Sequence, residues 1–326
     1  MAKADQVKAL LRAYAIDDKQ NFYSVALQMA ADEAVRGHVK FAAELRDLVD
    51  AAKATRGVAP APRAIPLVQP KGELSELLTV HYPHEHLQTM VLAKEVQEKL
   101  QRVLVEQRQH ERLSAHSLAP RRKLLLVGPP GTGKTMTAAV LAGELRLPLF
   151  TVRFDSLITK FMGESASKLR LVFDAIKATR GVYFFDEFDS LGLQRGSQHD
   201  VAEMRRTLNM FLQLIERDDS NSLIVAATNH GKDLDTALFR RFDDVIRYAA
   251  PDNTQIQSLI LSRLGAFASN ALNLERIAEA GVGESHADVV NACNDALKDA
   301  IMAHETSVSE ESIIRHLRER ASMKIG

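Results

Sequence analysis

The chain has 326 residues, of which 46% are apolar and 26% are charged, the composition of an ordinary soluble protein large enough for two or three domains. Its 42 basic and 42 acidic residues balance, which counts against nucleic acid as the main partner. The single cysteine, Cys293, excludes an internal disulfide and favours a reducing compartment. No secretory signal or apolar run of membrane-spanning length is evident, so we expect a cytoplasmic protein without a membrane partner.

The N-terminal part divides into a helical and a proline-rich segment. Apolar residues recur at helical spacing within residues 1–53, which predicts a three-helix bundle. A bundle of this size buries little apolar surface, and we expect it to act as an adaptor for a substrate or partner. Four of the ten prolines lie at positions 60, 62, 66 and 70. Because proline lacks the N–H group and restricts its neighbour, residues 54–78 are predicted to be an extended linker.

From residue 79 the pattern alternates between strand and helix. This alternation predicts an α/β domain over residues 79–250, with a parallel five-stranded sheet and helices on both faces. After Pro251 the strand patterns stop, and residues 251–326 predict a small helical domain. The predicted strands are Leu124–Val127, Leu149–Arg153, Val182–Asp186, Leu223–Ala227 and Val245–Tyr248, and the predicted helices include Leu87–Gln109, Lys134–Arg146, Ser165–Thr179 and Val201–Arg217.

The segment Gly128–Thr135, with the sequence GPPGTGKT, matches the phosphate-binding pattern G-x-x-x-x-G-K-[ST]. It follows a predicted strand and opens a predicted helix, which makes a chance glycine-rich turn a poor alternative. Glycines let the backbone N–H groups face phosphate oxygens, and the helix N-terminus adds its positive dipole end. Lys134 can reach the β- and γ-phosphates, and the Thr135 hydroxyl can bind Mg²⁺. The predicted ATP-binding residues here are Pro130, Gly131, Thr132, Gly133, Lys134, Thr135 and Met136.

A second candidate is the acidic pair Asp186–Glu187, which ends the apolar strand that begins at Val182. We expect this strand to neighbour the one before Gly128, so that both face the same phosphates. Asp186 would then bind Mg²⁺ with Thr135, and Glu187 would polarise the attacking water. Taken alone the pair is weak, because buried strands often end in a polar residue.

Asn229 follows the fourth predicted strand, and its amide could orient the attacking water near the γ-phosphate. An asparagine in an ordinary turn after a strand is an equally good interpretation.

Taken in order, these motifs resemble those of the AAA+ ATPases, and specifically the AAA clade of protein-unfolding and remodelling ATPases. Gly128–Thr135 looks like Walker A, Asp186–Glu187 ends a segment similar to Walker B, and Asn229 matches sensor 1. Leu234–Asp243 resembles the second region of homology, and Gly283–Asp288 resembles the Gly-x-Ser-x-Ala-Asp start of the lid helix. The chain also resembles the ATPase module of membrane AAA proteases, and the resemblance covers about residues 79–310. It implies a P-loop NTPase fold with a C-terminal helical lid, ATP and Mg²⁺ as cofactors, and nucleotide contacts at Ser285 and Ala287.

The resemblance also implies a hexameric ring in which arginine fingers act across subunits. Arg240 and Arg241 occupy the finger region, with Arg241 the better candidate. The family often has Pro-Gly before the second arginine, and this chain lacks it. Salt bridges with Asp243 and Asp244 are the alternative role for these arginines.

The segment from Lys160 to Ser165 resembles the first pore loop of the AAA clade, with Phe161 and Met162 as the gripping pair. In that family the aromatic side chain holds a polypeptide in the central channel. A buried Phe161–Met162 pair packed on the sheet is the alternative.

The histidines at positions 81, 84 and 86 lack a cysteine or a convincing carboxylate to complete a zinc set. The resemblance instead implies that their segment borders the adenine pocket.

The leading hypothesis is therefore a ring-forming ATPase that remodels or unfolds a protein substrate. The sequence shows neither a metalloprotease H-E-x-x-H motif nor a convincing serine nucleophile, so any proteolysis would come from a separate protease partner. A nucleic-acid-associated motor and a nucleotide-switched scaffold are the alternatives.

Overall fold

The computed structural model describes residues 25–26, 29–30, 38, 42–43, 69–157, 164–188, 198–230, 236–269 and 272–323, with residues 155, 198–205 and 236–237 described by their backbone alone. The chain divides into two units, Met1–Ile65 and Pro66–Gly326. In the first unit the described residues are too few to test the predicted bundle, most of which lies outside them. Four of them are buried apolar residues, namely Ala26, Met29, Ala30 and Ala42. Among the helices of the described residues, none has the length and hydropathy needed to cross a membrane.

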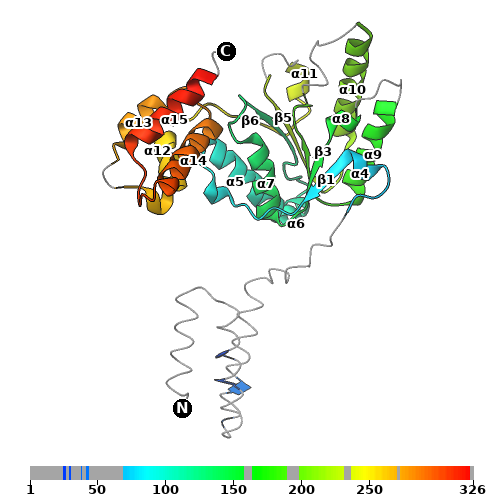
Figure 1. The fold of residues 1–326 in the computed structure, drawn as a ribbon. Helices are drawn as coiled ribbons and strands as arrows, with labels where there is room; N and C mark the ends of the chain where they lie inside the picture. Colours follow the sequence, from blue (N-terminus) through cyan, green and yellow to red (C-terminus); the bar gives the residue numbers. More distant parts are fainter. Residues whose placement is uncertain are drawn as a thin grey trace. The chain divides into compact units, whose positions relative to one another are not determined.

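One six-stranded sheet forms the centre of the second unit, in the order β1-β3-β4-β5-β2-β6 (Figure 1). All neighbouring strands from β3 to β6 pair in parallel, whereas β1 pairs with β3 in the antiparallel direction. The strands are β1 (Leu78–His81), β2 (Lys123–Val127), β3 (Leu149–Val152), β4 (Val182–Phe185), β5 (Leu223–Thr228) and β6 (Asp244–Arg247).

The five predicted strands are present, each within one or two residues of its expected bounds. Two expectations were wrong. The sheet has a sixth, antiparallel edge strand, β1, at the position where we predicted the end of the linker. Helix α4 (Leu74–Leu77) leads directly into this strand. The strand that carries Asp186 was expected beside β2, but β5 lies between β4 and β2.

Helices cover both faces of the sheet. Successive side chains of a strand point to opposite faces, and apolar side chains on both faces need cover. In β2, Leu124 and Leu126 pack against one face and Leu125 and Val127 against the other. Figure 1 shows α5 and α7 on the first face and α9 and α10 on the second. The helices of this α/β part are α5 (Lys94–Arg108), α6 (His110–Ser114), α7 (Lys134–Leu145), α8 (Phe154–Leu157), α9 (Glu164–Ala178), α10 (Gln198–Arg217) and α11 (Thr236–Phe239).

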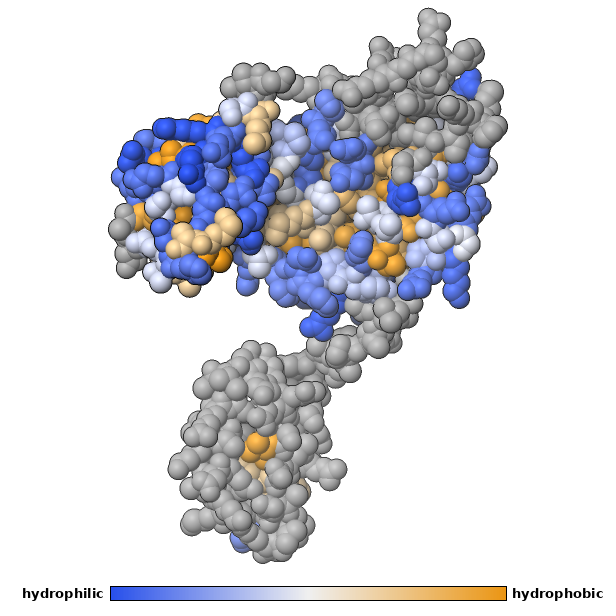
Figure 2. Space-filling view, in the orientation of Figure 1, coloured by the Kyte–Doolittle hydropathy of each residue, from blue (hydrophilic) through white to orange (hydrophobic). Residues whose placement is uncertain are grey.

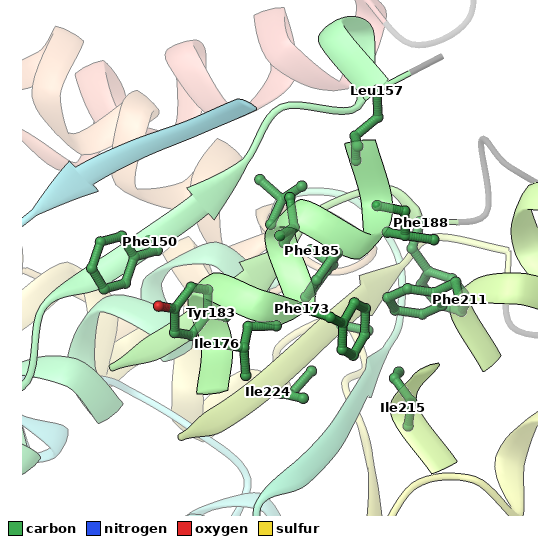
Figure 3. Close-up of a cluster of buried hydrophobic side chains, with 14 of the residues drawn as sticks. Phe150, Leu157, Phe173, Ile176, Tyr183, Phe185, Phe188, Phe211, Ile215 and Ile224 are labelled. Carbon is green, nitrogen blue, oxygen red and sulfur yellow. The ribbon is translucent and has the colours of Figure 1, made fainter. Parts of the chain in front are cut away.

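An aromatic cluster fills the second face, under α9 and α10 (Figure 3). The ring of Phe185, at the end of β4, lies 4.9 Å from Phe211 and 6.1 Å from Phe173, measured between centroids. The side chains of Phe185 and Phe211 are fully buried. This packing fixes the end of β4, from which the acidic pair Asp186–Glu187 continues.

The helix predicted over Leu87–Gln109 is shorter than expected. A 3₁₀ turn, η1 (Leu87–Thr89), comes first, and α5 starts only at Lys94. Extended backbone at Met90 and Ala93 separates the two. The segment between them is available to line a cavity.

The helices that follow β6 pack around an apolar core of their own and are called the lid below. Two of these helices begin with a capping box, at Asp252 and at Ser285, and each box satisfies helix N–H groups that would otherwise lack partners. Figure 2 shows the visible lid surface as mostly hydrophilic. The lid elements are α12 (Asn253–Leu264), η3 (Gly265–Phe267), α13 (Leu274–Ala280), α14 (His286–Met302) and α15 (Glu310–Met323).

Candidate nucleotide-binding site

The loop between β2 and α7 has the backbone that a phosphate site requires. Gly131 and Gly133 have φ values of 73° and 96°, in the left-handed region that glycine adopts without steric cost. A Cβ atom at Gly131 would also lie 2.4 Å from Ser285 Oγ on the lid, so glycine is needed for the close approach as well. Helix α7 then begins at Lys134 and directs its N-terminal N–H groups toward the loop.

Lys134 is buried within this loop. Its Nζ donates to Gly128 O at 2.7 Å and to Pro129 O at 2.8 Å, and Thr132 Oγ1 donates to the same Pro129 oxygen at 2.8 Å. These bonds hold the ammonium group beside the loop backbone. A charged oxygen is a stronger acceptor than a neutral carbonyl, so the position favours an anionic ligand.

The loop and the acidic pair meet across β5. Thr135 Oγ1 donates to Asp186 Oδ2 at 3.0 Å, although β4 and β2 are not adjacent. The Thr135 hydroxyl and the Asp186 carboxylate are both hard oxygen ligands of the kind that Mg²⁺ prefers. Within the described residues no cluster of three or more His, Cys, Asp and Glu side chains suits a metal ion. An ion at Thr135 and Asp186 would therefore take its other ligands from water and phosphate, as Mg²⁺ commonly does.

Glu187 has an unusual backbone conformation for its residue type. Its φ of 50° is left-handed, and its N–H donates to Asp186 Oδ1 at 3.0 Å. This conformation costs roughly 1–3 kcal/mol in a residue other than glycine, and such strain is concentrated at functional positions. The exposed Glu187 side chain lines the same cavity as the phosphate loop.

A cavity of about 620 Å³ joins these groups, a volume typical of small-molecule sites, which measure roughly 300–1,000 Å³. Asn229, half-buried after β5, reaches the same cavity. The loop, the acidic pair and Asn229 therefore share one space. The lining residues that the sequence predicted are Pro130, Gly131, Thr132, Gly133, Lys134, Thr135, Met136, Asp186, Glu187, Asn229 and Ala287.

The lid closes the other side of the cavity. The Ala287 N–H, in the first turn of α14, donates to Gly131 O at 3.0 Å and ties the lid to the phosphate loop. Ser285 does not line the cavity; it caps α14 and its Oγ lies 2.6 Å from Asp288 Oδ2. Its contact with nucleotide stays a prediction, and the structure adds a role in starting the helix.

Several lining residues were not predicted from the sequence. Beyond the phosphate loop, η1 and the segment after it contribute an apolar wall, and α12 and α14 contribute the rest. The only sequence signal for any of these residues is the Gly283–Asp288 motif, which marks the start of α14. These residues are Thr89, Met90, Val91, Leu92, Leu259, Ser262, Arg263, His286, Val290 and Asn291.

The histidine segment, which was predicted to border the adenine pocket, ends just before the cavity lining begins. The cavity lining begins at Thr89, and none of the three histidines contributes to it. His86 Nδ1 lies 3.5 Å from Glu144 Oε1, and the Leu87 N–H donates to that same oxygen at 3.1 Å. These contacts attach the segment to α7.

Arg240 and Arg241 lie after α11 and do not line the cavity of their own chain. Arg241 forms an ion pair with Glu216 at the end of α10. The alternative partners are engaged elsewhere: Asp243 accepts from the backbone N–H groups of Arg122 and Lys123, and Asp244 pairs with Lys99. Phe161 and Met162 lie outside the described residues.

The fold and this cavity define a P-loop α/β protein with a helical lid. The family model "ATPase family associated with various cellular activities (AAA)" matches residues 124–249. The uncharacterized AAA family ATPase y4kL of Sinorhizobium fredii is 31% identical over all of this chain and 98% of its own length.

The chain belongs to the AAA family and is an ATPase, which confirms the family, the fold class and the enzyme class predicted from the sequence. The ATP-dependent zinc metalloprotease FtsH 2 of Bdellovibrio bacteriovorus is 36% identical over 59% of this chain and 32% of its own length. This chain thus spans about a third of that relative. The AAA domain of FIGL-1 superposes with a TM-score of 0.60 and 26% identity, over 78% of this chain and 92% of that domain.

Replacing Lys134 tests the phosphate loop. We expect Lys134→Ala to weaken ATP binding at least tenfold, because the charge-assisted bond to phosphate is lost. Isothermal titration with ATP measures the affinity. Lys94→Ala, an exposed lysine at the start of α5, is the matched control and should bind normally. Unchanged affinity in Lys134→Ala would show that the loop does not hold the phosphates.

Proposed function

We propose that this chain is a Mg-ATP-driven motor that assembles into a ring and unfolds or remodels a protein substrate. The observation that supports this most is the convergence of the phosphate loop, the acidic pair and the lid on one cavity. A hydrogen bond between Ala287 and Gly131 couples that cavity to the lid. Binding and loss of the γ-phosphate can therefore bias the position of the lid.

The phosphate loop binds and orients the triphosphate. Backbone N–H groups of the loop and the first turn of α7 face its oxygens, and Lys134 supplies positive charge. Thr135 and Asp186 would hold Mg²⁺, which when bound neutralises charge on the β- and γ-phosphates. Catalysis of phosphoryl transfer depends mainly on such placement and charge stabilisation.

Glu187 and Asn229 act on the attacking water. The carboxylate of Glu187 accepts a hydrogen bond from the water and withdraws its proton as the oxygen attacks. Asn229, directly after the neighbouring strand β5, orients the same molecule. The packed end of β4 keeps Asp186 and Glu187 at a constant place relative to Thr135.

Glu187→Gln separates binding from hydrolysis. The amide keeps the size of the side chain but cannot take a proton, so we expect ATP affinity to persist while kcat falls roughly 10²- to 10⁴-fold. Phosphate release under single-turnover conditions measures the chemical step. A turnover rate equal to that of the unmodified chain would reject Glu187 as the base. Glu76→Gln, an exposed glutamate outside the cavity, serves as the control.

The finger arginines support assembly into a ring. Arg240 and Arg241 lie outside the cavity of their own subunit, so they can stabilise γ-phosphate charge only at a neighbour's site. In the single chain Glu216 holds Arg241, and assembly would exchange this carboxylate for phosphate. Arg241 is 38% exposed, which leaves it accessible for that exchange. We propose a homo-hexamer, in keeping with the AAA clade.

Mixed rings test action between subunits. We expect Arg241→Ala to bind ATP but lose roughly 10³-fold or more in kcat, as removal of an arginine finger does. Mixing it with Lys134→Ala subunits should restore part of the ATPase activity. In such rings some interfaces pair an intact cavity with an intact finger. Glu216→Gln, which removes only the partner of Arg241, should remain active. Absence of any recovery on mixing would argue against a finger acting between subunits.

The client would be gripped by Phe161 and Met162, in the segment between α8 and α9. An aromatic side chain contacts any polypeptide without demanding a sequence, which suits a motor with varied clients. The N-terminal unit would select the client, and a separate protease could receive it. The chain holds neither of the protease signatures sought in its sequence.

Client retention distinguishes a threading motor from a nucleotide-switched scaffold. A Glu187→Gln ring in ATP should retain its client, which mass spectrometry of the purified complex identifies. Adding Phe161→Ala should release the client while the ring, measured by light scattering, stays intact. Phe161→Tyr keeps an aromatic group and should still retain it. Equal retention by the alanine variant would favour the scaffold, and retained nucleic acid in place of protein would favour a nucleic-acid motor.

A further inference from the structure

His286 is the first residue of α14 and lies on the lid side of the nucleotide cavity. The Gly-x-Ser-x-Ala-Asp pattern leaves this position open, so nothing in the motif assigned it a role. Val290, one helical turn along the same face, also lines the cavity. The two residues thus present a polar group and then an apolar group along one side of the site.

The imidazole of His286 has no hydrogen-bond partner among the residues that the structure describes. Both ring nitrogens, Nδ1 and Nε2, are buried. Buried polar side-chain atoms are nearly always paired, and an unpaired one calls for an explanation such as a ligand. Because this side chain borders the cavity, a nucleotide placed there can supply the partner.

The charge state of the imidazole decides which partner fits. Burial lowers the pKa of His286 below its ordinary value, and the nearby Asp252 carboxylate opposes this effect only in part. The ring is therefore neutral at pH 7, with one nitrogen donating and the other accepting. A neutral donor–acceptor group matches a hydroxyl better than it matches a phosphate.

The position of His286 along the cavity indicates which part of the nucleotide it meets. The adjacent Ala287 is bonded to Gly131 at the phosphate end of the cavity, whereas Val290 lies one helical turn further along α14 and lines the cavity with apolar residues such as Leu259. Phosphates bind at the first end, and an apolar slot suits a purine base. The ribose joins the two and carries hydroxyl groups that both donate and accept.

We infer that His286 is a specificity-determining residue that hydrogen-bonds a ribose hydroxyl of the bound nucleotide. This inference rests on the proposed function, since it places a nucleotide in the same cavity. The bond connects the lid to the sugar, in addition to the backbone bond that connects the lid to the phosphate loop. The site then distinguishes ribonucleotides from their deoxy counterparts through the lid.

The test is a titration of the full chain with ADP, 2′-deoxy-ADP and 3′-deoxy-ADP. The unmodified chain should bind ADP roughly three- to tenfold more tightly than one of the deoxy analogues, the effect of one neutral hydrogen bond. His286→Phe fills a similar volume without a hydrogen-bonding group. It should weaken ADP by the same factor and leave that analogue unaffected. His286→Gln, which can donate and accept, should recover part of the discrimination.

Three results would overturn the inference: equal weakening of all three nucleotides by His286→Phe, no weakening of any, or no discrimination by the unmodified chain. Thermal unfolding without nucleotide checks that each variant is folded, and His286→Gln carries the test if His286→Phe is not. Failure of the unmodified chain to bind any of the three would instead refute the proposed function. The two failures are thus distinguishable.

Discussion

The hydrogen bond between Thr135 and Asp186 is the contact on which the proposed chemistry depends, because it joins the phosphate loop to the acidic pair. The two residues follow strands that are not adjacent, so the bond requires β5 to hold β2 and β4 at a fixed separation. Parallel pairing directs the carboxyl ends of all three strands to one edge of the sheet, where ligands of open α/β sheets bind. The packing of Phe185 against Phe211 of α10 fixes the carboxyl end of β4 at that edge. A mainly apolar core thus positions the polar groups of the phosphate loop and the acidic pair.

Much of this arrangement could be predicted from the sequence, for physical reasons that differ between its parts. The phosphate loop was predictable because glycines with left-handed backbone, a lysine and a hydroxyl must occur at fixed spacing. The parallel strands were predictable because strands buried on both faces read as continuous apolar runs. Strand order was not, since the crossover between β3 and β4 has the same local sequence signals whichever neighbour β4 takes. The edge strand β1 was missed because Leu78–His81 is short and follows a proline-rich segment.

The lid side of the site was the least predictable part. Its residues come from two separate helices, α12 and α14, and single side chains such as His286 have no repeating pattern that marks them as cavity-lining. The length of the helix near Leu87 was also misjudged, because apolar residues continue at helical spacing past Leu87 although the backbone is extended at Met90 and Ala93. Tertiary contacts with α7, including the bond from the Leu87 N–H to Glu144, override the local helical preference.

Tyr248, just after β6, limits how the lid can move. Its N–H donates to Val127 O at 2.7 Å, its hydroxyl lies 2.7 Å from Thr137 Oγ1 on α7, and its carbonyl leaves no room for a side chain at Gly128. These contacts hold the chain against the start of the phosphate loop as far as Tyr248, the residue that follows β6. In the proposed motor, a rotation of the lid would therefore change the backbone between Ala249 and Asp252, where Pro251 restricts it. Because these residues lie close to the phosphate loop, a small displacement at the nucleotide would then produce a larger displacement in the parts of the lid that lie farther from it.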